Sequence, residues 1–131
     1  MVKEIISTSN APKALGPYSQ AVKIDKSLYI SGQIAIDPKT GDIPEGIEAQ
    51  THQIFSNIKA ILDSVGFSLS DVVSCDVYMK NLKDFPLMNK IYAEIFDPFC
   101  NKSGYPSRAT VEVSNIPKGA LLEIKTIAIK K

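Results

Sequence analysis

The C-terminal part of the chain contains the sequence Tyr105-Pro106-Ser107-Arg108-Ala109-Thr110-Val111-Glu112-Val113, followed after a short connection by Leu121-Leu122-Glu123-Ile124. Both stretches are rich in β-branched and other apolar residues, which predicts two closing strands, Ala109–Val113 and Leu121–Ile129. The connection between them is short and contains the turn Pro117-Lys118-Gly119, so we expect these two strands to be neighbours in one sheet.

Side-chain alternation assigns the residues of the first closing strand to two faces. The apolar positions, which we expect to pack beneath helices, are Ala109, Val111 and Val113. The polar positions, which point the other way, are Arg108, Thr110 and Glu112. The polar side of this strand is therefore predicted to meet solvent or another subunit.

The preceding residues predict four more strands and two helices. The predicted elements are a strand Lys3–Ser7, a loop Asn10–Tyr18, a hairpin of Gln20–Ile24 and Leu28–Ile34, a turn at 37–42, a helix with apolar positions from Ile47 to Val65, a strand marked by Val72, Val73, Val77 and Tyr78, and a helix with apolar positions from Phe85 to Phe96. Gly66 is a natural residue with which to end the first helix. Asp84 is the expected N-cap of the second, with Pro86 tolerated in its first turn.

The order β-β-β-α-β-α-β-β predicts a single α+β domain over residues 1–131. We expect one mixed sheet of about six strands with both helices on one face, which leaves the other face uncovered. Leu28-Tyr29-Ile30 and Leu121-Leu122 are apolar on both sides, which favours a second covering layer. We therefore infer a homo-oligomer with sites in the clefts between protomers.

Composition excludes several classes of function. The net charge is +1 and the lysines are scattered, which gives no electrostatic basis for binding nucleic acid or an anionic membrane. No stretch has the length of a membrane span, and Met1-Val2-Lys3-Glu4-Ile5-Ile6 is too short and charged for a signal peptide. We expect a cytoplasmic protein. There is no cysteine or histidine pair at metal spacing, so no metal or cofactor is expected.

Two cysteines are present. Cys75 lies in an apolar strand, where a free thiol behaves as a small hydrophobic residue, and Cys100 is expected in a loop. A reduced pair is favoured over a disulfide, although the sequence leaves both open.

Arg108 is the strongest candidate for a binding residue. Its guanidinium is a planar fork that grips a carboxylate through two hydrogen bonds, and Pro106 and the following strand fix its backbone. The alternative, equally compatible with the spacing, is a structural ion pair with Glu112 or with a carboxylate of a neighbouring protomer.

Glu123 is the strongest candidate for proton transfer. It lies in an otherwise apolar strand, as either an exposed strand residue or a partly buried carboxylate whose pKa is raised into a useful range. The expected neighbourhood of the Arg108 strand favours the second interpretation.

Three other features have weaker signals. Tyr18 ends a stiff Gly-Pro loop, where it either caps a pocket or packs on its own loop. Gly32, between Ser31 and Gln33, either lets a ligand or another backbone come close or forms a bulge. His52 is predicted to be an ordinary exposed residue of the first helix.

Together these stretches resemble the reactive-intermediate deaminase family (RidA, also called YjgF), and the resemblance covers nearly the whole chain. Its most specific part is the opening stretch 105–113 with Leu122-Glu123-Ile124. The other matching segments are residues 14–21 (ALGPYSQA), 30–33 (ISGQ), 37–41 (DPKTG), 57–62 (NIKAIL) and 88–96 (MNKIYAEIF).

The resemblance implies a chorismate-mutase-like fold and a homotrimer with three sites between adjacent subunits. The implied activity is hydrolysis of 2-imino acids, such as 2-iminobutanoate and 2-iminopropanoate, to 2-keto acids and ammonia, without a metal or cofactor. This reaction removes the reactive enamines released by PLP-dependent dehydratases. Carried over by position, Arg108 binds the substrate carboxylate and Glu123 holds or activates water. The implied pocket residues are Tyr18, Ser31, Gly32, Asn89 and Thr110. Thr110 stands where many members have cysteine, which argues against an obligatory thiol.

Two alternatives remain open. One is a trimeric regulatory protein that binds a small carboxylate without physiological turnover. The other is an endoribonuclease or translation inhibitor, an activity described for some relatives. The near-neutral charge and the absence of a candidate catalytic histidine disfavour RNA cleavage.

Overall fold

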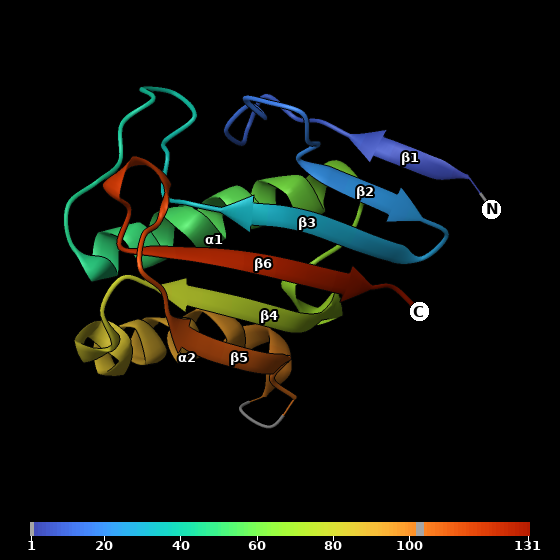
Figure 1. Cartoon of the computed structure of the whole chain (residues 1–131). Coiled ribbons are helices and arrows are strands. Elements are labelled where there is room, and N and C mark those ends of the chain that lie inside the picture. Colours follow the sequence, from blue (N-terminus) through green and yellow to red (C-terminus); the bar gives the residue numbers. More distant parts are fainter. Residues whose placement is uncertain (1, 102–103) are drawn as a thin grey trace.

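One six-stranded sheet has both helices on one of its faces, as Figure 1 shows for the computed structural model of the chain. The structure describes residues 2–101 and 104–131. The elements are β1 (Lys3–Ile6), β2 (Ala21–Ile24), β3 (Ser27–Gln33), α1 (Ile47–Ser64), β4 (Val72–Met79), α2 (Phe85–Cys100), β5 (Ser107–Glu112) and β6 (Leu122–Ile129), with short 3₁₀ turns η1 (Leu69–Asp71), η2 (Leu82–Asp84) and η3 (Pro117–Gly119). The predicted order, sheet and α+β class are confirmed.

The strand order β1-β2-β3-β6-β4-β5 corrects one prediction. β5 pairs in parallel with β4 alone, whereas β6 lies between β3 and β4 and is antiparallel to both. The strands of Arg108 and Glu123 are therefore not neighbours, because β4 separates them. The connection through η3 is long enough to carry the chain past the end of β4 into the centre of the sheet. There, the alternate β6 residues Leu122, Ile124 and Ala128 become fully buried.

The predicted facing of β5 is also wrong, although its alternation is confirmed. In the parallel pair, Arg108 lies opposite Cys75 and Thr110 lies opposite Val77, both of which point into the core. Arg108 and Thr110 thus share the helix side of the sheet. Val111 is on the open side, where 44% of its surface is exposed. β5 is an edge strand, so its helix-side positions lie at the border of α2, where a long polar side chain still reaches solvent.

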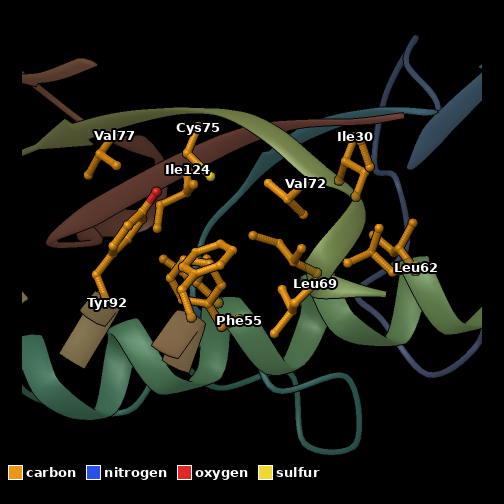
Figure 2. Close-up of a cluster of buried hydrophobic side chains, with 14 of the residues drawn as sticks. Ile30, Phe55, Leu62, Leu69, Val72, Cys75, Val77, Tyr92 and Ile124 are labelled. Atoms are coloured by element: carbon orange, nitrogen blue, oxygen red, sulfur yellow. The ribbon is translucent and has the colours of Figure 1, made fainter. Parts of the chain in front are cut away.

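The core fills the space between the sheet and the two helices. Figure 2 shows side chains of α1 and α2 directed at β4 and β6, with Tyr92 reaching from α2 toward the strands. Phe55 of α1 contacts Tyr92 and Phe96 of α2 edge to face, at ring-centroid distances of 5.7 and 5.4 Å. Such aromatic contacts contribute about 0.5–1.5 kcal/mol beyond the area that they bury. This cluster fixes α2, and with it one wall of the candidate site.

The helix ends agree in part with the sequence. Gly66 has φ +74° just beyond α1 and its N–H donates to Asp63, as predicted. Pro86 lies in the first turn of α2 and Asp84 is at its N-cap position, as predicted, but the Asp84 side chain makes no capping hydrogen bond. Asn81 instead accepts from the Lys83 N–H and caps the preceding 3₁₀ turn, which enters α2 directly.

α2 is longer than predicted. It continues through Pro98 to Cys100, so Cys100 ends a helix and does not lie in a loop. Proline is tolerated there because only the last turn loses a backbone hydrogen bond, and Asn101 in the left-handed region then closes the helix.

The sheet face away from the helices carries an apolar row. The strand registers place Ile5, Val22, Tyr29 and Ile127 directly opposite one another across β1, β2, β3 and β6. Tyr29 is 44% exposed and Ile5 is 57% exposed. We call these four residues the open-face row. In the described residues, neither helix is both long and apolar enough to cross a membrane.

Candidate functional site

Arg108 projects from β5 over the side of α2. Its guanidinium carbon lies 4.7 Å from the centre of the Tyr92 ring and 5.5 Å from that of Phe85. Among residues 2–101 and 104–131, no carboxylate lies within ion-pair distance of it. Glu112, the partner considered from sequence, instead accepts a hydrogen bond of 2.9 Å from the Leu82 N–H. The arginine is therefore exposed with its N–H donors available to a ligand.

Two adjoining hollows meet at Arg108, and we call them together the arginine cleft. Its lining residues are Leu82, Phe85, Asn89, Tyr92, Ala93, Tyr105, Pro106, Arg108 and Thr110. Two of the predicted pocket residues, Asn89 and Thr110, thus line the same cleft as Arg108. The Thr110 hydroxyl is buried without a hydrogen-bond partner in the described part of the chain. Such a group is costly unless a ligand or a neighbouring molecule completes it.

Glu123 points to the opposite side of the sheet. It pairs with Tyr78 across β4 and β6, while its neighbours Leu122 and Ile124 point into the core. A Cβ at position 32 would lie 2.6 Å from Oε2 of Glu123 and 2.9 Å from Cδ. Gly32 is therefore the residue that lets the carboxylate lie against β3. The sheet register also shifts between Ile30 and Gln33, so the bulge interpretation of this glycine is confirmed. The group that comes close to Gly32 is the Glu123 side chain and not another backbone.

The Glu123 carboxylate is partly buried, and desolvation raises its pKa above the ordinary value. This outcome matches the second of the two interpretations that the sequence left open. A group with a raised pKa exchanges protons nearer to neutral pH, which suits proton transfer. The surrounding hollow, which we call the glutamate cleft, is lined by Lys13, Leu15, Tyr18, Gly32, Ile34, Ile36, Pro117, Lys118 and Glu123.

Of the residues predicted for this pocket, Tyr18 and Gly32 line the glutamate cleft, whereas Ser31 is not among its lining residues. Tyr18 is 53% exposed, and its hydroxyl accepts a 3.4 Å hydrogen bond from the Leu15 N–H. Ser31 donates from Oγ to the Ser19 carbonyl at 2.6 Å, which ties the loop to β3. Ser31 therefore positions the Tyr18 loop, and only its acceptor capacity remains for a ligand.

Three further residues were not found from the sequence. Gln20 is buried and holds the same loop through hydrogen bonds to Thr8 and to the Pro12 carbonyl. The sequence feature that could have identified Gln20 is its position as a polar residue at the start of an apolar strand. Phe85 and Tyr92, which contact Arg108, are seven residues apart on one helix, and this spacing places them on one face. Nothing in the sequence connected that face to the arginine.

The two strongest candidates, Arg108 and Glu123, are not brought together within one chain. They lie on opposite faces of the sheet, and two strand spacings of about 4.8 Å each separate their backbones. Instead, the chain presents two clefts: one with an anion-binding group and one with a carboxylate. A site that uses both groups must join the arginine cleft of one molecule to the glutamate cleft of another.

The remaining titratable candidates have ordinary positions. His52 is exposed on α1, as predicted. Cys75 is a fully buried free thiol beside Thr126, and burial raises its pKa. Cys100 is also free. In residues 2–101 and 104–131, no group of three or more metal-ligating side chains comes together.

The sequence is similar to known proteins over almost its whole length. A family model described as endoribonuclease L-PSP matches residues 8–130. A RutC family protein of Pyrococcus horikoshii is 52% identical over 131 residues, which make up 99% of this chain and 100% of the relative. A RutC family protein of Saccharolobus solfataricus is 49% identical over 130 residues, covering 98% of this chain and 99% of the relative.

Solved structures share the fold. YyfA of Yersinia pestis, described as a member of the conserved Rid protein family, has a TM-score of 0.91 and 44% identity, covering 98% of this chain and 100% of its own. The YjgF gene product of E. coli has a TM-score of 0.92 and 38% identity. E. coli TdcF, solved with bound serine, has the same two values. Each of the last two matches covers 98% of this chain and 99% of the other.

Proposed function

This chain belongs to the Rid/YjgF family, whose model is described as endoribonuclease L-PSP, and on that basis we propose that it hydrolyses 2-imino acids to 2-keto acids and ammonia. The proposed substrates are small imines such as 2-iminobutanoate and 2-iminopropanoate, and the protein is proposed to act in the cytoplasm. The proposal is carried by two observations: an arginine in one cleft with no carboxylate partner among the described residues, and a carboxylate of raised pKa in another cleft.

The proposed assembly is a homotrimer in which the arginine cleft of one subunit faces the glutamate cleft of the next. Two observations support it. Arg108 and Glu123 lie on opposite faces of one sheet, so a ring of head-to-tail contacts brings each arginine to a neighbour's glutamate. The open-face row leaves apolar side chains in water unless another molecule covers them.

The chemistry needs few groups. Arg108 holds the substrate carboxylate through two charge-assisted hydrogen bonds, which orients C2 toward Glu123 of the neighbouring subunit. Glu123 takes a proton from water as the water oxygen bonds to C2, and the π electrons of the C=N bond move to nitrogen, which takes a proton from solvent. Glu123 then returns its proton to the nitrogen of the carbinolamine. The C2–N bond breaks and ammonia leaves, while the hydroxyl proton passes to solvent as the C2=O bond forms. A positioned acid or base contributes roughly 10²–10⁴-fold to such a reaction.

The other proposed site residues have supporting roles. Tyr18 closes the glutamate cleft over the substrate, and Ser31 fixes the loop that carries Tyr18. Gly32 leaves space for the carboxylate of Glu123. Asn89 and Thr110 add polar contacts beside Arg108, and the Thr110 hydroxyl then gains the hydrogen-bond partner that it lacks among residues 2–101 and 104–131.

A coupled assay tests the proposal. A PLP-dependent dehydratase and its amino acid supply the imine, and the rate of 2-keto acid formation is measured with and without the protein. We expect acceleration by the wild type, little by Arg108→Ala, and full acceleration by Lys90→Ala, a control that removes an exposed charge from α2. The proposal is wrong if the wild type does not accelerate hydrolysis or if Arg108→Ala matches it.

Binding without turnover is the second candidate. Its support is the solved structure of E. coli TdcF with bound serine, a small molecule with a carboxylate, at a TM-score of 0.92 to this chain. Under this alternative, Arg108→Ala abolishes binding of a small keto acid, and the wild type shows no acceleration in the coupled assay. RNA cleavage that survives Arg108→Ala would instead favour the nuclease activity in the family description.

A further inference from the structure

We infer that Phe85 and Tyr92 are positioning residues for Arg108, forming an aromatic cradle that holds the guanidinium for carboxylate binding. This inference rests on the proposed function of Arg108 as the substrate anchor. Seven residues of α-helix rise about 10.5 Å. The guanidinium carbon lies over both rings, 5.5 Å from the centre of the Phe85 ring and 4.7 Å from that of the Tyr92 ring, and so contacts two side chains that are two helical turns apart.

The residue type at position 108 supports the cradle. Arg108 is the only arginine in the chain, against fourteen lysines. A guanidinium stacks on aromatic faces and is weakly hydrated, whereas an ammonium is compact and strongly hydrated. This chain thus uses lysine for every other cation and arginine at the position where the cation lies over aromatic rings.

The Tyr92 ring is itself held in place. It is buried, and its centroid lies 4.8 Å from that of Phe96 and 5.7 Å from that of Phe55. Its hydroxyl is directed toward the sheet, beside the thiol of Cys75, without a hydrogen-bond partner in the described residues (Figure 2). The ring, not the hydroxyl, is therefore the part of Tyr92 that acts on Arg108.

The consequence concerns the direction of the N–H donors. When aromatic rings occupy the faces of a guanidinium, its in-plane N–H groups remain for hydrogen bonds. No side-chain acceptor of the described residues uses them, so they are available to a planar carboxylate. The cradle reduces the freedom of a long side chain before binding, and such preorganisation increases affinity.

The single arginine makes the inference testable without any substrate. Its Nε–Hε group gives one side-chain signal in a ¹H–¹⁵N spectrum, and Arg108→Lys identifies that signal by removing it. In the wild type, we expect this signal to be displaced by the ring currents of the cradle. Tyr92→Leu and Phe85→Leu should move it toward the position of a free arginine. Tyr92→Phe, which keeps the ring, should leave it near the wild-type position.

Binding of 2-oxobutanoate, measured by calorimetry on the same assembled proteins, gives the second readout. Loss of a cation–π contact should weaken binding roughly threefold to thirtyfold in Tyr92→Leu and in Phe85→Leu. Tyr92→Phe should bind as the wild type does, and Arg108→Lys should bind at least as weakly as the leucine variants. Phe85 is only half-buried, so Phe85→Leu remains informative if Tyr92→Leu does not fold.

Failure of this inference differs from failure of the proposed function. If the wild type binds 2-oxobutanoate, Arg108→Ala does not, and both leucine variants keep wild-type affinity and arginine signal, the cradle is wrong and the anchor stands. If the wild type neither binds 2-oxobutanoate nor accelerates imine hydrolysis, the proposed function itself is wrong. A displaced arginine signal that changes in the leucine variants would then still support the stacking.

Discussion

Arg108 and Glu123 occupy opposite faces of one sheet, with β4 between their strands. Arg108 shares the helix side with Cys75, whereas Glu123 shares the open side with Tyr78. No rotation of either side chain brings the two charged groups across the sheet. A reaction that needs both therefore depends on assembly, and this dependence gives the proposal its most direct test.

Two inactive variants should restore activity to each other. Arg108→Ala and Glu123→Gln are each expected to lose most turnover. In a ring that contains both variants, the interface between Arg108 of a Glu123→Gln subunit and Glu123 of an Arg108→Ala subunit has both groups intact. Every mixed trimer has one intact interface among its three, so the mixed assemblies should give about a third of the wild-type turnover. The variants are co-expressed with different tags, the mixed assemblies are purified through both tags, and the coupled assay is repeated.

The control for this mixture is Arg108→Ala combined with the double variant Arg108→Ala/Glu123→Gln, which contains no intact interface in any arrangement. It should remain inactive. If the first mixture is no more active than its components, the two groups do not act in one site formed between copies.

Gly32→Ala should displace the Glu123 carboxylate without unfolding the chain. The added Cβ would lie 2.6 Å from Oε2, which forces a shift, and the flexible glutamate side chain yields more readily than the β3 backbone. Turnover should fall strongly, with a change in unfolding free energy within about 1 kcal/mol, as for most strain that a side chain relieves. The coupled assay and urea denaturation measure the two quantities.

A double-variant comparison shows whether the effect of Gly32→Ala passes through Glu123. In the Glu123→Gln background, Gly32→Ala should lower turnover little further, since the group that it displaces has already lost its function. Fully additive losses would mean that Gly32 acts on substrate or backbone independently of the carboxylate.

Glu123 should make stability depend on pH in a defined direction. Burial raises its pKa above the ordinary value of 4.5, so the folded protein binds this proton more tightly than the unfolded chain does. The contribution of Glu123 to stability therefore falls as pH rises through the interval above 4.5. At neutral pH, Glu123→Gln should be more stable than the wild type, and the difference should shrink as the pH approaches the ordinary value. Denaturation of both proteins across this range measures it.

Turnover should follow the opposite trend, since the proposed mechanism uses the ionised carboxylate. The rate should decline as the pH is lowered through the raised pKa, which is above the range of an exposed glutamate. In the denaturation experiment, a stability advantage of Glu123→Gln over the wild type that grows on acidification would contradict the assignment of Glu123 as a desolvated carboxylate.

The parts of the fold that depend on local pattern were predictable from sequence. Alternation and helical spacing identified all six strands and both helices, and Gly66 marked the end of α1. The order of the strands in the sheet could not be predicted from sequence. The insertion of β6 between β3 and β4 is determined by long-range burial and not by the turn at Pro117. Asp84 occupies the expected N-cap position of α2, but its side chain makes no capping hydrogen bond, and Asn81 caps the preceding 3₁₀ turn η2.

In the candidate site too, local sequence identified the residues but not how they are arranged in the fold. Residue type and the family resemblance selected Arg108 and Glu123. The structure adds that Arg108 has no ion-pair partner in the part of the chain that it describes and that Glu123 is partly desolvated. The facing of Arg108 was predicted wrongly because an edge strand offers polar side chains a route to solvent on either face. The aromatic neighbours of Arg108 depend on how α2 packs beside β5, and no local pattern contains that information.

Tyr29→Lys should disrupt the assembly. Tyr29 is in the open-face row, and the proposed trimer covers this row, so a lysine there would bury an unpaired charge at a cost of several kcal/mol. Sedimentation should show a smaller species with native-like circular dichroism and little turnover in the coupled assay. Phe99→Lys is the matched control, because Phe99 is similarly exposed, at 41% against 44%, but belongs to α2 on the other side of the sheet. If Tyr29→Lys keeps both the wild-type mass and turnover, the open face is not the surface at which the subunits meet.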